Sequence, residues 1–330
     1  MAGEKSFLQT IKMEISRSFR LVPYERIAFH KILSILKTES GRNILLKELT
    51  KSEDIRTSAI ETLASFDDQG VTDKLAEMLG GKISDKEAVL VLECLAERGS
   101  EKHHQAVTDY IEKNKSGTQS PHVVRKAFEV LRKTGASSES VRDYLLSFIK
   151  GEGVSDMLVP MAINALSSFP VISPYEPLLK QNDEKIIQAA YNALFNLGCN
   201  LSDMAKKAES DPEGLYTYSP ENEDKSILDI RVLLGKMAPR FDNYPRNIKV
   251  AFISAMISCN HREFLVYVMK ALTSRDQELI KMVLFTIYAN IKTLKDPDKL
   301  LRSLIALSTE KEHENELIID IFVKYFSQDI

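Results

Sequence analysis

The sequence predicts an all-α fold, an α-solenoid of about nine antiparallel helix pairs stacked side by side. Three observations predict it. Apolar residues recur at helical spacing along most of the chain, no segment alternates with a period of two, and the helical segments return about every 33 residues. The hairpin dipeptides Asn-Gly and Asp-Gly are absent, so we expect no β-sheet.

Each expected pair is identified by its second helix, because these segments carry the clearest apolar stripes. Gly and Pro residues such as Gly99, Pro121 and Gly135 separate the helices, and short connections of this kind join antiparallel neighbours. The second helices are expected near residues 23–37, 52–66, 85–98, 120–134, 154–168, 182–197, 244–259, 276–292 and 311–327.

A core pair four residues apart recurs in these helices, often with a small first member that lets neighbouring helices approach. Successive pairs begin 28–36 residues apart, except for one interval of 61. The pairs are Ala28/Ile32, Ala59/Leu63, Val91/Leu95, Ala127/Leu131, Ala162/Leu166, Ala190/Leu194, Ala251/Ala255, Leu284/Tyr288 and Ile318/Phe322.

The long interval equals one repeat plus an insertion. Residues 199–225 are acidic and rich in turn-forming residues, so we expect an exposed inserted loop there. The expected organisation is therefore repeats 1–6 in residues 1–198, the acidic loop in 199–225, and repeats 7–9 in 226–330, all within one continuous solenoid.

Three stretches resemble the second helix of the HEAT/armadillo superfamily: residues 54–66, 121–135 and 183–198. The resemblance implies a helical-repeat fold over nearly the whole chain. In that family an Asp and an Arg form a ladder between repeats. Here Arg125 and Lys249 occupy the basic position, Arg56 is one place away, and other helices lack the residue. Tetratricopeptide-like repeats remain an alternative architecture, although the chain lacks their characteristic Trp.

Composition restricts the partners and the compartment. Lys and Arg number 44 against 47 Asp and Glu, so the net charge of −3 creates no overall field for nucleic acid or anionic lipid. Three widely spaced cysteines, Cys94, Cys199 and Cys259, suit a reducing compartment, and we expect a cytoplasmic protein. No stretch is apolar enough to predict membrane insertion.

Catalytic motifs are absent from the sequence. It contains no Walker-type Gly loop, no Gly-x-Ser-x-Gly and no His-Glu-x-x-His, so we expect neither an enzyme nor a bound cofactor. The nearest candidates for a metal site are His103 with His104 and Cys259 with His261. Adjacent side chains diverge on a helix, so we expect structural roles and no metal.

The expected function is a noncatalytic scaffold or regulatory subunit that binds a partner protein or peptide on its helical surface. Tyr216 and Tyr218 in the acidic loop are candidates for ordering on a partner. N-terminal basic residues, among them Arg20, Arg26 and Lys31, could dock an acidic partner. Polar residues of the second helices are the remaining candidate contacts: Arg56, Arg125, Lys126, Glu129, Gln188, Asn192, Lys249 and Lys281.

The alternative function is nucleic-acid binding by the N-terminal basic helices, as in the DNA glycosylases with HEAT-like folds. The charge balance and the absence of Trp make nucleic acid the less favoured partner.

Overall fold

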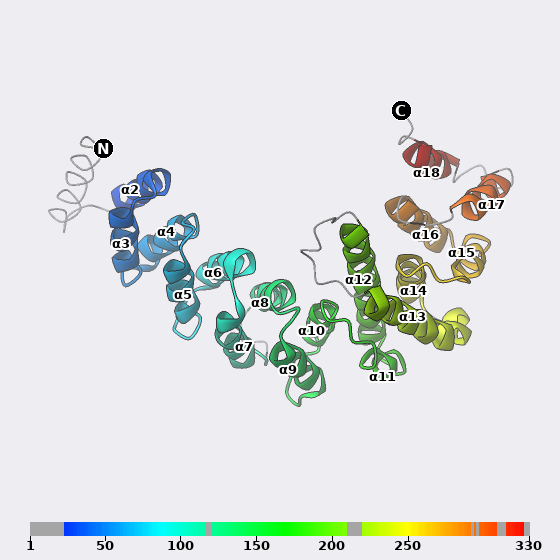
Figure 1. The fold of residues 1–330 in the computed structure, drawn as a ribbon, viewed down its shortest axis with the longest axis horizontal. Helices are drawn as coiled ribbons and strands as arrows, with labels where there is room; N and C mark the ends of the chain where they lie inside the picture. The colour runs from blue at the N-terminus through cyan, green and yellow to red at the C-terminus, as the bar shows by residue number, and fades with distance from the viewer. Residues whose placement is uncertain are drawn as a thin grey trace. The chain divides into compact units, whose positions relative to one another are not determined.

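The computed structural model describes residues 23–116, 120–209, 220–291, 294, 297–308 and 315–326. The chain divides into two compact units, Met1–Leu158 and Val159–Ile330. Within the described residues every regular element is a helix and there is no strand, which confirms the all-α prediction (Figure 1).

Helices of unit 1 pack in a regular order. Each even-numbered α-helix contacts the next even one, from α2 to α8, while α3, α5 and α7 each pack against the helix that follows. The elements are α2 (Pro23–Leu36), α3 (Glu39–Glu48), α4 (Glu53–Leu63), α5 (Gln69–Met78), α6 (Asp85–Arg98), η1 (Glu101–His103), α7 (His104–Lys113), α8 (Pro121–Thr134) and α9 (Glu139–Lys150).

Unit 2 follows the same order of contacts. Helices α10, α12, α14, α16 and α18 pack in succession, and each helix from α11 to α17 with an odd number packs against the one that follows. The elements are α10 (Val159–Leu166), α11 (Tyr175–Leu179), α12 (Glu184–Glu209), α13 (Pro220–Met237), η2 (Ala238–Asn243), α14 (Arg246–Ser258), α15 (Phe264–Leu272), α16 (Gln277–Asn290), α17 (Asp298–Ser308) and α18 (Asn315–Phe326).

Side-chain caps start several of these helices. The carboxylate of Asp68 accepts from the N–H of Val71 at the start of α5, and Asp276 accepts from Leu279 at the start of α16. Both bonds satisfy an N–H group that has no partner within the helix. Ser84 and Glu87 form a capping box at the start of α6.

The expected core pairs are mostly buried. In α4, α6, α8, α10, α12 and α14 both members are at most 4% exposed, as the stacking pattern predicts. The first pair is wrong: Ala28 and Ile32 are exposed, and His30 and Leu33 are the buried residues of α2. Tyr288 in the eighth pair is also exposed, and the Lys324 ammonium of α18 lies 4.1 Å from the centre of its ring.

One close approach in unit 2 requires a glycine. A Cβ built on Gly198 would lie 2.4 Å from the Ser258 hydroxyl oxygen, so any larger residue would push α12 away from α14. Gly198 directly follows the second helix that the sequence predicts over residues 182–197. In the structure it lies inside α12, where it permits the contact between the two helices.

The expected loop over 199–225 is wrong at both ends. Helix α12 continues to Glu209 and α13 begins at Pro220, while residues 210–219 lie outside the described residues. The sequence of the extension, with Ala, Lys and Glu, has high helix propensity, and prolonging an existing helix avoids a new nucleation cost. The division after Leu158 was not expected, and the single continuous solenoid stays a prediction.

Among the described helices, none combines the length and the apolar character needed to span a bilayer.

Candidate functional site

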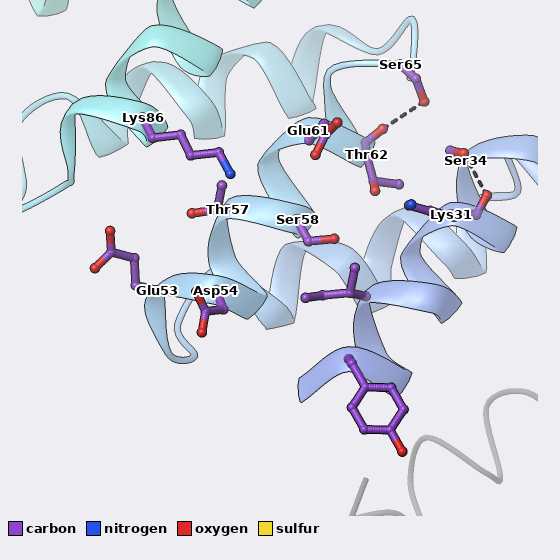
Figure 2. A pocket seen from close by; sticks show the side chains of 12 residues that line it. Lys31, Ser34, Glu53, Asp54, Thr57, Ser58, Glu61, Thr62, Ser65 and Lys86 are labelled. Atoms are coloured by element: carbon purple, nitrogen blue, oxygen red, sulfur yellow. Dashed lines mark hydrogen bonds between the residues drawn. The ribbon is translucent and has the colours of Figure 1, made fainter. Parts of the chain in front are cut away.

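An open hollow of about 740 Å³ runs across α2, α4 and α6 in unit 1 (Figure 2). We call it the α2–α6 groove. It lies where three successive even-numbered helices expose their polar sides. Its lining residues are Tyr24, Ile27, Lys31, Ser34, Glu53, Asp54, Thr57, Ser58, Glu61, Thr62, Ser65 and Lys86.

The spacing of polar residues in α4 produces the central wall of the groove. Asp54, Ser58 and Glu61 follow one another at intervals of four and three, so they share one side of α4, and Ser65 follows just beyond the end of the helix. The opposite side carries buried Ala59 and Leu63. The amphipathic pattern that buries α4 therefore also sets its polar side toward the hollow.

Hydroxyl groups line the centre of the groove. Thr57, Ser58 and Thr62 are each at most 9% exposed. The Ser58 hydroxyl lies 3.0 Å from Nδ1 of His30, and the Ser65 hydroxyl donates to the Thr62 carbonyl at 2.7 Å. The Thr62 hydroxyl forms no hydrogen bond with any described residue, although only 6% of the residue is exposed. This hydroxyl lines the hollow, where it can form a hydrogen bond with a ligand.

Charged side chains surround these hydroxyls without pairing. Figure 2 shows Lys86 and Lys31 on opposite sides of the α4 hydroxyls. Three carboxylates, Glu53, Asp54 and Glu61, complete the rim. Within the described part of the chain none of these five groups forms an ion pair or a hydrogen bond. Both signs of charge are therefore free to meet a partner.

An ion pair fixes the border between α4 and α6. Arg56 donates from Nε to Oε1 of Glu87 at 2.6 Å and from Nη2 to Oε2 at 3.0 Å, and the Glu87 side chain is fully buried. The N–H of Ser84 also donates to Oε2, at 2.8 Å. Burial alone would raise the pKa of the Glu87 carboxyl, but the bonds from Arg56 and Ser84 outweigh it, and the pKa is lowered. This ion pair therefore holds α4 and α6 together at the edge of the α2–α6 groove.

Three of the predicted second-helix contacts in unit 1 form internal ion pairs: Arg56, Lys126 and Glu129, which also lies 3.4 Å from Lys133. Arg56 forms an ion pair with Glu87, so its guanidinium is already neutralised by a group of the same chain. Lys126 lies 3.3 Å from Glu93 and 3.5 Å from Glu129. Arg125 stays exposed and donates to Nδ1 of His122 at 2.9 Å. Their binding roles stay predictions, with Arg125 the most accessible.

Predicted contacts in unit 2 also differ in accessibility. Gln188 accepts a hydrogen bond from Asn247 at 2.8 Å, and the Lys249 ammonium lies 5.8 Å from the centre of the Phe241 ring. Asn192 is exposed, and Lys281 is exposed beside Glu278 at 4.0 Å. The structure thus separates internally engaged side chains from open ones.

The N-terminal basic residues do not form one patch in the described part. Lys31 lines the α2–α6 groove, whereas Arg26 donates to Glu48 of α3 at 2.8 Å. Arg20, Tyr216 and Tyr218 lie outside the described residues.

The histidines considered for metal binding have other contacts. Nε2 of His103 lies 2.9 Å from Asp73, and Nε2 of His104 lies 3.0 Å from the Thr134 hydroxyl. Nε2 of His261 lies 3.1 Å from the Arg231 carbonyl. No cluster of metal-ligating residues occurs among the described residues.

Sequence reasoning did not identify most of the groove. Of its lining residues only Lys31 was a candidate contact. The usable signal was the polar stripe of Asp54, Ser58 and Glu61 opposite the apolar stripe of the same helix. Which polar stripe borders a hollow depends on the positions of α2 and α6, and one helix cannot supply that information.

No protein-family model matches the chain, and no curated protein matches it. Among solved structures, the chain is similar to an engineered protein with a known crystal structure. The two sequences are 18% identical, and the TM-score between the two structures is 0.39. The alignment covers 96% of this chain and 87% of that one. A similarity this low carries no argument about fold or function.

Proposed function

We propose that this chain is a noncatalytic interaction scaffold or regulatory subunit, built as a HEAT-like α-solenoid of about nine antiparallel helix pairs. Its α2–α6 groove binds an extended, polar segment of a partner protein. The observation that carries this proposal is the groove itself, an open hollow with five unpaired charges around buried hydroxyl groups.

The repeated contacts support the solenoid. Bonds between successive even-numbered helices join residues about one repeat apart: 28 for His30 with Ser58, 31 for Arg56 with Glu87, 32 for Asn164 with Asn196 and 30 for Arg246 with Asp276. Contact only between sequence neighbours is the pattern of stacked repeats. Arg56 with Glu87 also resembles the inter-repeat ladder of the HEAT/armadillo superfamily, although Arg56 is one place from the family's basic position and pairs with a Glu rather than an Asp.

The lining chemistry favours a peptide over a small molecule. Ligand pockets for small molecules are mostly apolar and enclosed, whereas this groove is open and all of its lining residues except Ile27 carry a hydroxyl or a charge. Hydroxyls such as that of Thr62 can bond the backbone of an extended chain. Lys31 and Lys86 suit acidic side chains of the partner, and Asp54 and Glu61 suit basic ones. The proposed ligand is therefore a segment of mixed charge.

The test compares partners retained by the intact chain and by a groove variant. Asp54→Lys combined with Glu61→Lys reverses two exposed, unpaired carboxylates and should leave folding intact. Partners captured from native lysate are identified by mass spectrometry, and the binding segment of each is measured by calorimetry. The groove variant should lose at least about tenfold in affinity.

Glu77→Lys provides the control, because Glu77 is exposed on α5 and lies outside the groove. Equal affinity of the wild type and the groove variant for every captured segment would contradict the proposal. Binding to duplex DNA or RNA that weakens steeply with salt would instead support the nucleic-acid alternative.

A further inference from the structure

Helices α16 and α18 expose apolar side chains that no described residue covers. Phe285 is 60% exposed on α16, and Ile319 and Val323 are 58% and 61% exposed on α18. These exposed fractions are high for large apolar side chains. Groups of exposed apolar side chains are typical of interaction sites. We call the following residues the C-terminal apolar face: Met282, Phe285, Tyr288, Ile305, Ile319 and Val323.

Helical geometry places these residues on the outer sides of their helices. On α16, Met282 and Phe285 lie opposite the buried Ile280, Val283 and Ile287. On α18, Ile319 and Val323 are one turn apart and lie away from buried Ile321. The two outward sides thus form two rows with the spacing of successive helical turns.

A contact joins the two rows. The ammonium of Lys324 on α18 lies 4.1 Å from the centre of the Tyr288 ring and donates to the Tyr288 carbonyl at 2.7 Å. Lys324 therefore links α18 to the exposed Tyr288 of α16. Helices α16 and α18 also pack directly on each other, so the two rows lie on neighbouring helices.

An apolar hollow adjoins the face. It has a volume of about 360 Å³ and lies between α17 and α18, lined by Ile305, Ser308, Ile318, Ile319 and Phe322. Four of the five lining residues are apolar, and Ile305 and Ile319 also belong to the face. A hollow of this size accepts an aliphatic or aromatic anchor side chain, the typical centre of a binding interface.

The free charges beside the face are acidic on α18. Glu316 and Asp320 are exposed on its outward side, and neither forms an ion pair with a described residue. On α16, Glu278 and Lys281 lie 4.0 Å apart and offset each other. Arg302 is exposed on α17 one turn before Ile305 and is not one of the residues that line the hollow. Basic groups of a partner are therefore favoured over α18 and disfavoured over α17.

We propose that the C-terminal apolar face binds an amphipathic helix of a partner protein that carries basic residues beside its apolar stripe. Two rows with helical-turn spacing accept a stripe of residues at i, i+3 or i+4, and i+7. One anchor of that stripe enters the hollow between α17 and α18. Lys or Arg next to the stripe pairs with Glu316 and Asp320. This surface lies in unit 2 and is independent of the α2–α6 groove.

Two designed helical peptides test the proposal on the full chain: one of Leu and Lys, LKKLLKLLKKLLKL, and its counterpart LEELLELLEELLEL. Both have the same apolar stripe and opposite charge. Fluorescence anisotropy should show binding of the Lys peptide at least about tenfold tighter than that of the Glu peptide. Phe285→Ser and Ile319→Ser should each weaken it at least about tenfold, and Asp320→Lys should reduce the preference for the Lys peptide.

Val266→Ser is the matched control, since Val266 is 58% exposed on α15 and lies outside the face. Failure of the Lys peptide to bind, or equal affinity for Phe285→Ser, Ile319→Ser and Val266→Ser, would overturn the proposal. Self-association of the wild type that Phe285→Ser abolishes, measured by sedimentation, would assign the face to a second copy and would also overturn it. Circular dichroism confirms that each exposed-site variant keeps its helices.

Discussion

The two units use one order of helix contacts but different chemistry to hold their helices together. In unit 1, buried or partly buried charged groups join neighbours, with Arg56 on Glu87 and Arg26 on Glu48. In unit 2 a cluster of aromatic rings does so: Tyr191, Phe241, Tyr244, Phe252 and Tyr267 contact one another with centroids 5.0–6.5 Å apart. The repeating backbone pattern therefore leaves the choice of side-chain contact open, and each unit should respond to its own kind of substitution.

The largest effect is expected from Ala190→Asp in unit 2. Ala190 is fully buried in α12, which packs on both α10 and α14, so the new carboxylate would have no water and no partner. We expect a loss of about 4 kcal/mol or more in the free energy of unfolding. Hydrogen exchange should accelerate in α10, α12 and α14 together. Asn192→Asp provides the control, because Asn192 is exposed on the same helix. A melting temperature of Ala190→Asp equal to that of the wild type would refute the core assignment.

Phe252→Ala tests the aromatic cluster. Phe252 is fully buried and contacts four other rings, so its removal leaves a cavity that should cost about 3–5 kcal/mol. Urea denaturation measures the loss. Phe285→Ala removes the same side chain from an exposed site and should change stability little. Similar losses for the two variants would mean that the cluster contributes no special stability.

Glu87→Gln tests the charged border in unit 1. The change leaves Arg56 without its carboxylate and should cost about 2–3 kcal/mol at pH 7. Glu77→Gln, at an exposed ion pair on α5, should cost much less.

The same pair should make unit 1 sensitive to acid. The pKa of Glu87 is lowered in the folded chain, so its contribution is present above the pKa of the unfolded chain and is lost as the pH falls through the folded value. The stability difference between wild type and Glu87→Gln should therefore shrink when urea titrations are repeated from pH 7 downward. A difference that stays constant to pH 3 would show that the ionised carboxylate is not what stabilises the border.

The smallest effect is expected from Arg246→Ala. Its ion pair with Asp276 joins α14 to α16 at 2.9 Å, but both side chains are at least 35% exposed. Solvent screening limits such a pair to less than about 1 kcal/mol. Replacing Arg246 rather than Asp276 preserves the cap that Asp276 provides to α16. A loss as large as that of Glu87→Gln would remove the distinction between buried and exposed pairs.

The sequence predicted helices better than it predicted their register or partners. Apolar spacing located α6 at 85–98 without error, because a full stripe and Gly99 define it. It failed in α2, where Ala28 and Ile32 fit the repeat, but His30 contacts Ser58 of α4 and Leu33 is buried beside Gly41 of α3. The sequence of α2 contains two possible apolar sides, and the positions of α3 and α4 determine which of the two is buried.

Partner residues were harder to predict for the same reason. Arg56 is a charged residue of the kind expected at a partner-binding surface, yet its side chain pairs with Glu87 in the next repeat. Phe285 and Val323 look like core residues in an apolar run, yet they are exposed. A single helix sequence states that a residue is polar or apolar, and the neighbouring helices determine whether that residue is covered.

The α2–α6 groove takes its walls from three consecutive helix pairs, and among the described residues the five charged groups on its rim form no bond between those pairs. A substitution of Asp54, Glu61 or Lys86 would change the contacts with one part of the ligand. It would not change the side chains that pack the helices together. Preference for a new ligand could therefore evolve one wall at a time, with each intermediate still a folded protein.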